Sequence, residues 1–347
     1  MTISKPPGDS KAKSHLTLAS SRGVNYVDAS LPREIPPDAM RYVDTDWTGD
    51  PPPRTWLIPG LIPDNRVGML VGEGGLGKSM LALQLCMALS TGDKEWLPGI
   101  GIENPNEPCS TMYFTFEEER DEVHRRVVKL GGADIGERLG DRLIRLDGAE
   151  TGEIWGPDPT KSGHTATLGA AARGMVIMQT ICEAKGVRFV VIDTAGHAFI
   201  SDENNRGIVN QFLRELDAWA RKRKIAVLLV SHPPKSSNAK YSGNSGWRGT
   251  IRMMLSMEMA TLRGNDKDGD QWPVLLLDKS NYGVPRHKSP KWWIQQEADG
   301  TLPEGKMQVM DKKSAMKVLM TERYGAKQNP DDYSEGSDAE DDPDWQF

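Results

Sequence analysis

The chain has few cysteines and no long apolar run. Its three cysteines, Cys86, Cys109 and Cys182, stand far apart among 347 residues and match neither a disulfide framework nor a metal-site spacing. We expect Cys86 and Cys182 to be small buried side chains in helices. No apolar stretch reaches the length of a membrane span, and the start, MTISKPPGDSKAKSHLTL, lacks the apolar segment of a signal peptide. We therefore expect a cytoplasmic protein without membrane contact.

Basic residues are absent from residues 331–347, DDYSEGSDAEDDPDWQF, which contain eight acidic residues. Without this acidic tail the net charge of −6 becomes about +2, because 43 basic residues then face 41 acidic ones. An acidic body would repel nucleic acid, whereas a body of this charge does not.

Four segments differ in composition, and no internal repeat is visible. Residues 1–53 are polar and end in a Pro-Pro-Pro linker, so we expect a flexible segment. Residues 54–310 have the apolar content of a globular domain. A short helical patch is expected at 311–330, followed by a disordered acidic tail at 331–347.

Within residues 54–310, short β-rich runs alternate with helical patterns. VGMLV precedes MLALQLCMAL, TMYFTF precedes RDEVHRRVVKL, and RFVVID precedes GIVNQFLRELDAWARK. Strands that alternate with helices are joined by right-handed crossovers into parallel sheets. The sequence therefore predicts an α/β fold with a twisted, mostly parallel central sheet and helices on both faces.

A glycine-rich stretch, GEGGLGKS, interrupts the first of these strand-helix pairs. It fits G-x-x-x-x-G-K-[ST] between a strand and a helix, the context of a phosphate-binding loop. Lys78 would reach the β- and γ-phosphates of ATP, and the Ser79 hydroxyl would hold Mg²⁺. The alternative is a glycine-rich turn without a ligand. The predicted nucleotide-binding residues are Gly72, Glu73, Gly74, Gly75, Leu76, Gly77, Lys78, Ser79 and Met80.

A phosphate loop needs an acid for the metal and a group that activates water. Asp193 ends the apolar run RFVVID and is a candidate metal ligand. Glu117 follows the aromatic run TMYFTF and is a candidate general base. Alternatively Glu117 belongs with Glu118 and Glu119, which we interpret as acidic residues at the start of the next helix.

Another strand pattern, IAVLLV, ends in Ser231 and His232. His232 is a candidate sensor of the γ-phosphate, although a structural hydrogen bond at a strand end would explain it equally well. The loop that follows contains basic and aromatic residues suited to single-stranded DNA, while an ordinary solvated loop has the same composition. These residues are Lys235, Lys240, Tyr241, Trp247 and Arg248.

Between about Arg54 and Glu304 the chain resembles the RecA-fold ATPases, and among them the RepA-like hexameric replicative helicases of plasmids, phages and prophages. The matching pieces are WLIPGLIPDNRVGMLVGEGGLGKS, YFTFEEERDEVHRR, VVIDTAGHAFISDEN, VLLVSHPPKS, WRGTIR and LDKSNYGVP. The resemblance implies a RecA-like ATPase domain over 54–310. The site residues that it implies are Lys78 and Ser79 on phosphate and Mg²⁺, Glu117 as catalytic base, Asp193 as Walker B acid and His232 as sensor.

The resemblance also implies a homo-hexameric ring in which a cation from the neighbouring subunit completes the ATP site. Arg252, Arg248 and Lys279 are the candidates for this trans finger, and an ordinary salt bridge is the alternative for each. A ring helicase would act on single-stranded DNA in replication.

Other functions stay open at this point. One is a RecA-fold recombination or loading factor that does not unwind processively. Another is a nucleotide-gated scaffold that recruits replication proteins through the acidic tail ending in Phe347. The tail could also compete with DNA for basic loops, or simply increase solubility. A small-molecule phosphotransferase has the same kind of loop, but no acceptor-site signature is visible.

Overall fold

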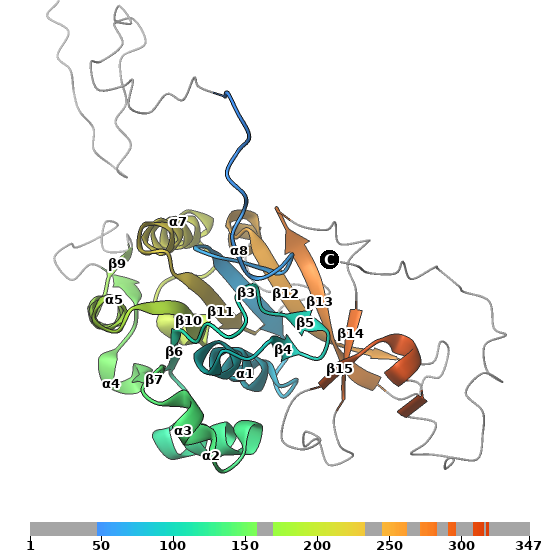
Figure 1. Ribbon diagram of the computed structural model, residues 1–347. Coiled ribbons are helices and arrows are strands. Elements are labelled where there is room, and N and C mark those ends of the chain that lie inside the picture. The colour runs from blue at the N-terminus through green and yellow to red at the C-terminus, as the bar shows by residue number, and fades with distance from the viewer. Residues whose placement is uncertain are drawn as a thin grey trace, which may run out of the picture. The chain divides into compact units, whose positions relative to one another are not determined.

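The structure, a computed structural model, describes residues 47–157, 169–232, 245–261, 271–282, 291–295, 308–315 and 317–318 (Figure 1). The chain divides into two compact units, Met1–Pro53 and Arg54–Phe347, and the described helices and strands belong to the second. The acidic tail, most of the first segment that was predicted to be flexible, and the loop residues Lys235, Lys240 and Tyr241 lie outside the described residues.

A nine-stranded sheet forms the centre of the second unit, in the order β15-β14-β13-β12-β3-β11-β10-β6-β7. From β12 to β7 every neighbouring pair is parallel, whereas β13, β14 and β15 add antiparallel pairs at one edge. The predicted α/β fold is confirmed; the antiparallel edge was not predicted. The strands are β3 (Val67–Gly72), β6 (Ser110–Thr115), β7 (Leu143–Asp147), β10 (Val187–Asp193), β11 (Ala226–Ser231), β12 (Met253–Thr261), β13 (Gln271–Ser280), β14 (Lys291–Gln295) and β15 (Gln308–Met310).

Helices cover both faces of the sheet, as predicted (Figure 1). The core on one face contains side chains of α1, α2 and α3, and the core on the other contains side chains of α5, α6, α7 and α8. The helices are α1 (Lys78–Thr91), α2 (Arg120–Gly131), α3 (Ile135–Leu139), α4 (Gly148–Thr151), α5 (Arg173–Lys185), α6 (Ala195–Ala198), α7 (Arg206–Arg223) and α8 (Ser245–Thr250). Three short hairpins complete the fold: β1 (Trp56–Ile58) with β2 (Ile62–Pro63), β4 (Glu95–Leu97) with β5 (Ile100–Gly101), and β8 (Trp155–Pro157) with β9 (Gly169–Ala171).

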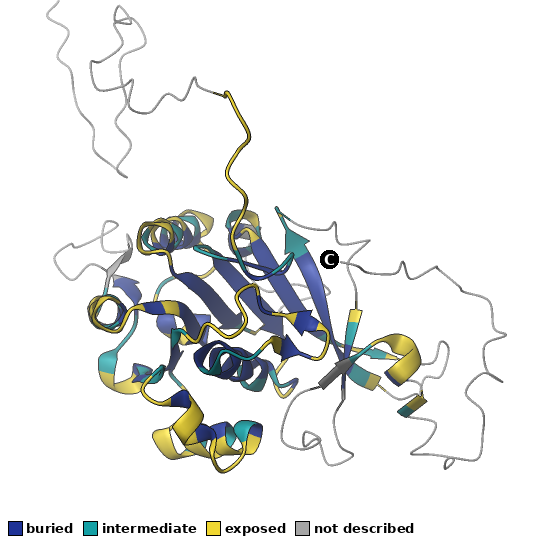
Figure 2. Cartoon of the chain, viewed as in Figure 1, coloured by how far each residue is buried: buried dark blue, intermediate teal, exposed yellow. Residues whose placement is uncertain are grey.

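The central strands are buried on both faces, which explains why they read as continuous apolar runs (Figure 2). Along β3, for example, Val67 and Met69 face one core and Leu70 faces the other. Cys86 in α1 and Cys182 in α5 are buried, as predicted. Burial raises the pKa of the Cys182 thiol to about 12 and raises that of Cys86 as well, so both thiols stay protonated and act as apolar packing groups.

Among the described helices, none combines the length and apolar character needed to cross a bilayer.

Candidate nucleotide-binding site

The predicted phosphate loop joins the end of β3 to the start of α1. Gly75 (φ 79°) and Gly77 (φ 90°) adopt left-handed backbone conformations, which glycine reaches at little cost. A Cβ atom on Gly72 would stand 2.6 Å from the backbone oxygen of Met257 in β12, so this glycine permits the close approach of two strands. The loop therefore turns directly into the N-terminus of α1, where free N–H groups favour an anion.

Lys78 is the first residue of α1 and is buried. Its ammonium group donates to the backbone oxygen of Glu73 (2.7 Å) and lies 3.5 Å from Nδ1 of His232. Burial lowers the pKa of Lys78, although Asp193, Glu117 and Glu73 act in the opposite direction. A buried cation held on the loop by a carbonyl is well placed to exchange that carbonyl for a phosphate oxygen.

The carboxyl ends of four neighbouring strands, β3, β11, β10 and β6, lie side by side in the sheet. Asp193 in β10 lies opposite Thr115 in β6 and Val230 in β11, and Ser231 in β11 lies opposite Val71 in β3. Because these strands are parallel, their carboxyl ends carry the residues that follow them to the same side. The structure thus brings together the phosphate loop, Glu117, Asp193 and His232.

Asp193 is buried and its two carboxylate oxygens have different surroundings. Oδ2 accepts a hydrogen bond from the Tyr113 hydroxyl at 2.5 Å, while Oδ1 is buried without a partner among the described residues. An orphaned buried oxygen is costly unless a ligand satisfies it, and carboxylate and hydroxyl oxygens are suitable ligands for Mg²⁺. Asp193 and Ser79 therefore fit the ion that the phosphate loop implies.

Glu117 lies two residues beyond β6 and is partly exposed. Its Oε1 atom lies 3.3 Å from Nδ1 of His197, and the same nitrogen lies 2.9 Å from Oγ1 of Thr194. Neither His197 nor Tyr113 was predicted as a site residue. His197 could have been found from the sequence because it lies four residues after Asp193, just beyond the carboxyl end of the same strand.

Glu118 and Glu119 directly precede α2, in agreement with their interpretation as residues at a helix start, and Glu119 is the N-cap. The carboxylate of Glu118 accepts a hydrogen bond from Arg126 at 2.5 Å. This carboxylate is thus committed to α2, which leaves Glu117 as the acid of the three that faces His197.

The three candidate trans cations lie together beside α8 and the paired ends of β12 and β13. Arg248 forms an ion pair with buried Asp278 (3.4 Å), and Lys279 donates to the backbone oxygen of Arg248 (2.5 Å). Arg252 is exposed, and its side chain has no hydrogen bond or ion pair within the part of the chain that the structure describes. Two of the three cations therefore have structural partners and Arg252 is the one that projects into solvent.

Trp247 was interpreted as part of a loop, either suited to single-stranded DNA or simply solvated, but the structure buries it within α8. Trp247 is 4% exposed and packs edge-on against Phe199 (5.6 Å between ring centroids) and Phe212 (6.0 Å). The reason is that its apolar ring fills the core between α7 and α8, where it anchors the segment that carries Arg248.

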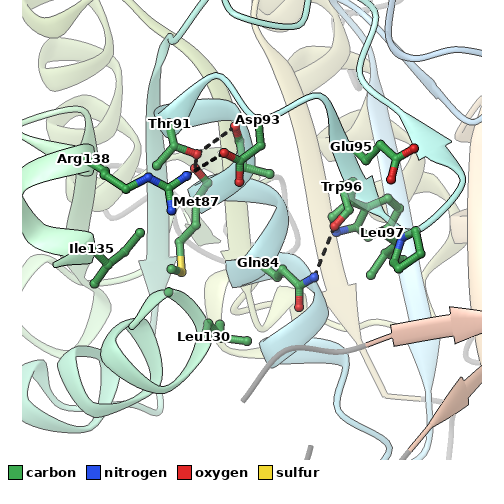
Figure 3. Close-up of a pocket in the computed structure, with 13 residues that line it drawn as sticks. Gln84, Met87, Thr91, Asp93, Glu95, Trp96, Leu97, Leu130, Ile135 and Arg138 are labelled. Carbon is green, nitrogen blue, oxygen red and sulfur yellow. Dashed lines mark hydrogen bonds and ion pairs between the residues drawn. The ribbon is translucent and has the colours of Figure 1, made fainter. Parts of the chain in front are cut away.

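A separate pocket of about 210 Å³ lies beside α1, α2 and α3 (Figure 3). Gln84 donates to the backbone oxygen of Trp96 (3.1 Å), and Arg138 pairs with Asp93 (2.7 Å) at its rim. Gln84 is the lining residue of α1 closest along the chain to Lys78, and it lies six residues away, which is about 9 Å along a helix. This pocket is therefore distinct from the phosphate loop.

A model of the AAA domain family matches residues 33–238 of the chain, which is more than half of its 347 residues. The matched range includes the phosphate loop, Glu117, Asp193 and His232, and it ends before Arg248. Such a match supports nucleotide binding and hydrolysis, typically with Mg²⁺. The chain therefore belongs to the AAA domain family of P-loop ATPases, whose fold is RecA-like.

Proposed function

We propose that the protein is an ATP-hydrolysing, ring-forming motor on single-stranded DNA, a RepA-like replicative helicase of a phage or other mobile element. ATP hydrolysis is supported by one observation: the carboxyl ends of neighbouring parallel strands bring together Lys78, Glu117, Asp193 and His232. The motor part rests on the resemblance of the whole domain and on an exposed cation, Arg252, whose backbone lies far from its own phosphate loop.

Each residue has a distinct role in this proposal. The loop amides and Lys78 bind the phosphates, and Ser79 with Asp193 would hold Mg²⁺, which neutralises charge on the β- and γ-phosphates when bound. Glu117 accepts a proton from the attacking water. His232, 3.5 Å from the Lys78 ammonium, detects the γ-phosphate and transmits its presence to the segment that it begins.

The position of Arg252 supports a finger that acts in trans. Met253, the next residue, pairs with Gly68 near the start of β3, whereas the phosphate loop begins at Gly72. Four residues of strand separate these positions by about 13 Å. The backbone at Arg252 therefore lies near the amino-terminal ends of β3 and β12, whereas its own nucleotide site lies at the carboxyl ends of the strands. We propose that Arg252 stabilises the transition-state charge in the site of a neighbouring subunit.

The first experiment measures steady-state ATP hydrolysis with and without single-stranded DNA over a range of protein concentrations. Glu117→Gln serves as the blank and Lys78→Ala as the variant that loses nucleotide binding. We expect DNA to stimulate hydrolysis and the rate per subunit to rise with concentration. A rate that ignores both DNA and concentration would refute the motor proposal, and stimulation without strand displacement would favour a loading or recombination factor.

A mixing experiment tests the trans finger. Arg252→Ala and Glu117→Gln are each expected to be inactive alone. When the two variants are mixed, a Glu117→Gln subunit supplies Arg252 to the intact site of its Arg252→Ala neighbour, so part of the activity returns. If mixtures stay as inactive as the separate variants while both still assemble, Arg252 does not act in trans.

A further inference from the structure

We propose that His197 is a positioning residue that holds the Glu117 carboxylate in the orientation required to accept a proton from water. The inference rests on the proposed role of Glu117 as general base. It is carried by the contact between Nδ1 of His197 and Oε1 of Glu117 at 3.3 Å.

Glu117 needs such a partner because nothing else among the described residues holds its carboxylate. The side chain is 44% exposed, and an exposed glutamate rotates among several rotamers that must be restricted before it can act as a base. A ring nitrogen 3.3 Å from Oε1 restricts rotation of the carboxylate and leaves Oε2 for the water.

The His197 ring is itself anchored on the sheet. Its Nδ1 atom lies 2.9 Å from the hydroxyl of Thr194, which is 4% exposed and directly follows β10. α6, which carries His197, is tied to the β8–β9 hairpin and its flanks by two backbone hydrogen bonds, from Ile154 to Ala198 (2.9 Å) and from Ile200 to Trp155 (2.8 Å). The backbone that carries His197 is therefore held in place, and its side chain, which is 61% exposed, is held by the contact with Thr194.

The two contacts of Nδ1 select one form of the ring. A carboxylate oxygen is acceptor-only, so its approach to Nδ1 is favourable when this nitrogen carries a proton. The Thr194 hydroxyl can then accept at the same nitrogen or rotate to another partner, because a hydroxyl both donates and accepts. The essential property of residue 197 is thus an N–H group at the Nδ1 position.

This property can be tested with three substitutions. His197→Ala removes the donor, His197→Asn keeps an N–H near the position of Nδ1, and His197→Gln moves the N–H farther out, toward the position of Nε2. We expect His197→Ala and His197→Gln to lower kcat for ATP hydrolysis roughly tenfold with an unchanged KM, and His197→Asn to restore most of the rate. His124→Ala, at an exposed histidine on α2, is the matched control and should behave as wild type.

The outcomes separate the inference from the proposed function. If Glu117→Gln hydrolyses ATP at the wild-type rate, the base assignment fails whatever residue 197 does. If Glu117→Gln is impaired but His197→Ala keeps the wild-type kcat, or if His197→Asn falls as far as His197→Ala, the positioning role is overturned. In the Glu117→Gln background, His197→Ala should lower the residual single-turnover rate no further; an additional tenfold loss would also contradict the inference.

Discussion

At the residue scale, Tyr113 shows how a buried polar group is tied to the nucleotide site. Tyr113 is 1% exposed, and its hydroxyl donates to Oδ2 of Asp193 on the neighbouring strand β10 at 2.5 Å. Burial raises the pKa of Tyr113 well above its ordinary value, and the neighbouring Asp193 raises it further. The hydroxyl therefore keeps its proton at physiological pH and holds one oxygen of Asp193, which leaves the orphaned Oδ1 free to face a metal ion.

Replacement of Tyr113 by Phe is expected to weaken Mg²⁺ binding. The substitution keeps the ring in the core and removes the donor, so that Asp193 loses its fixed orientation. We expect about tenfold more Mg²⁺ to be needed for the Mg²⁺-dependent part of fluorescent-nucleotide binding, with Mg²⁺-free binding unchanged, because hydrogen-bond partners of metal ligands typically contribute about 10- to 100-fold. Tyr282→Phe, at a tyrosine that stacks under Arg54, is the control; equal effects of both substitutions would contradict the prediction.

Sequence patterns located the residues whose role depends only on their neighbours along the chain. The spacing of Gly72, Lys78 and Ser79 belongs to one continuous loop, so the motif alone located it. Trp247 was misinterpreted because its burial depends on Phe199 and Phe212, which come from distant parts of the chain. His197 and Tyr113 were missed for the same reason: His197 acquires its role by contact with Glu117, beyond the end of β6, and Tyr113 by contact with Asp193 on the neighbouring strand β10.

At the scale of elements, the junction of β3 with the phosphate loop requires glycine for packing. We predict that Gly72→Ala lowers the free energy of unfolding by about 1–3 kcal/mol, because the new methyl group would meet the Met257 carbonyl at 2.6 Å. Gly74→Ala in the same loop has open space around its Cβ position and should leave stability within about 0.5 kcal/mol. Thermal or denaturant unfolding of both variants checks this, and equal stability of the two would show that β12 can move aside.

The strands β3, β6, β10 and β11 were predicted, whereas β7, β12, β14, β15 and the order of the strands were not. Apolar runs mark β3, β10 and β11 because parallel strands are buried on both faces. Run length and composition carry no information on which strand lies beside which, and β13 reads as apolar although it runs antiparallel to β12. The placement of β11 between β3 and β10 follows from pairing across long sequence distances, which no local pattern encodes.

At the scale of the whole molecule, the charge is divided unequally between body and tail. Removal of residues 331–347 changes the net charge from −6 to about +2. We predict that the chain ending at Pro330 binds single-stranded DNA more tightly, on the order of tenfold at about 50 mM salt, and that the difference shrinks as salt screens the charges. Fluorescence anisotropy with a labelled oligonucleotide measures this.

The matched control keeps the tail and replaces its eight acidic residues by the corresponding amides. If charge is the cause, this variant should bind DNA like the shortened chain. If removal of the tail changes neither DNA affinity nor the capture of replication proteins, its proposed competitive and recruiting roles are both lost.

The position of β3 inside the sheet has a consequence for folding during synthesis on the ribosome. Val67 pairs with Val227, 160 residues later, and Gly68 pairs with Met253, 185 residues later. The strand that presents the phosphate loop thus leaves the exit tunnel long before either neighbour exists. A nascent chain that has not yet reached β11 and β12 contains an apolar strand, β3, with two unpaired edges, and such a strand is a target for chaperones. The ability to bind ATP would consequently appear late in synthesis and report that translation has passed β12.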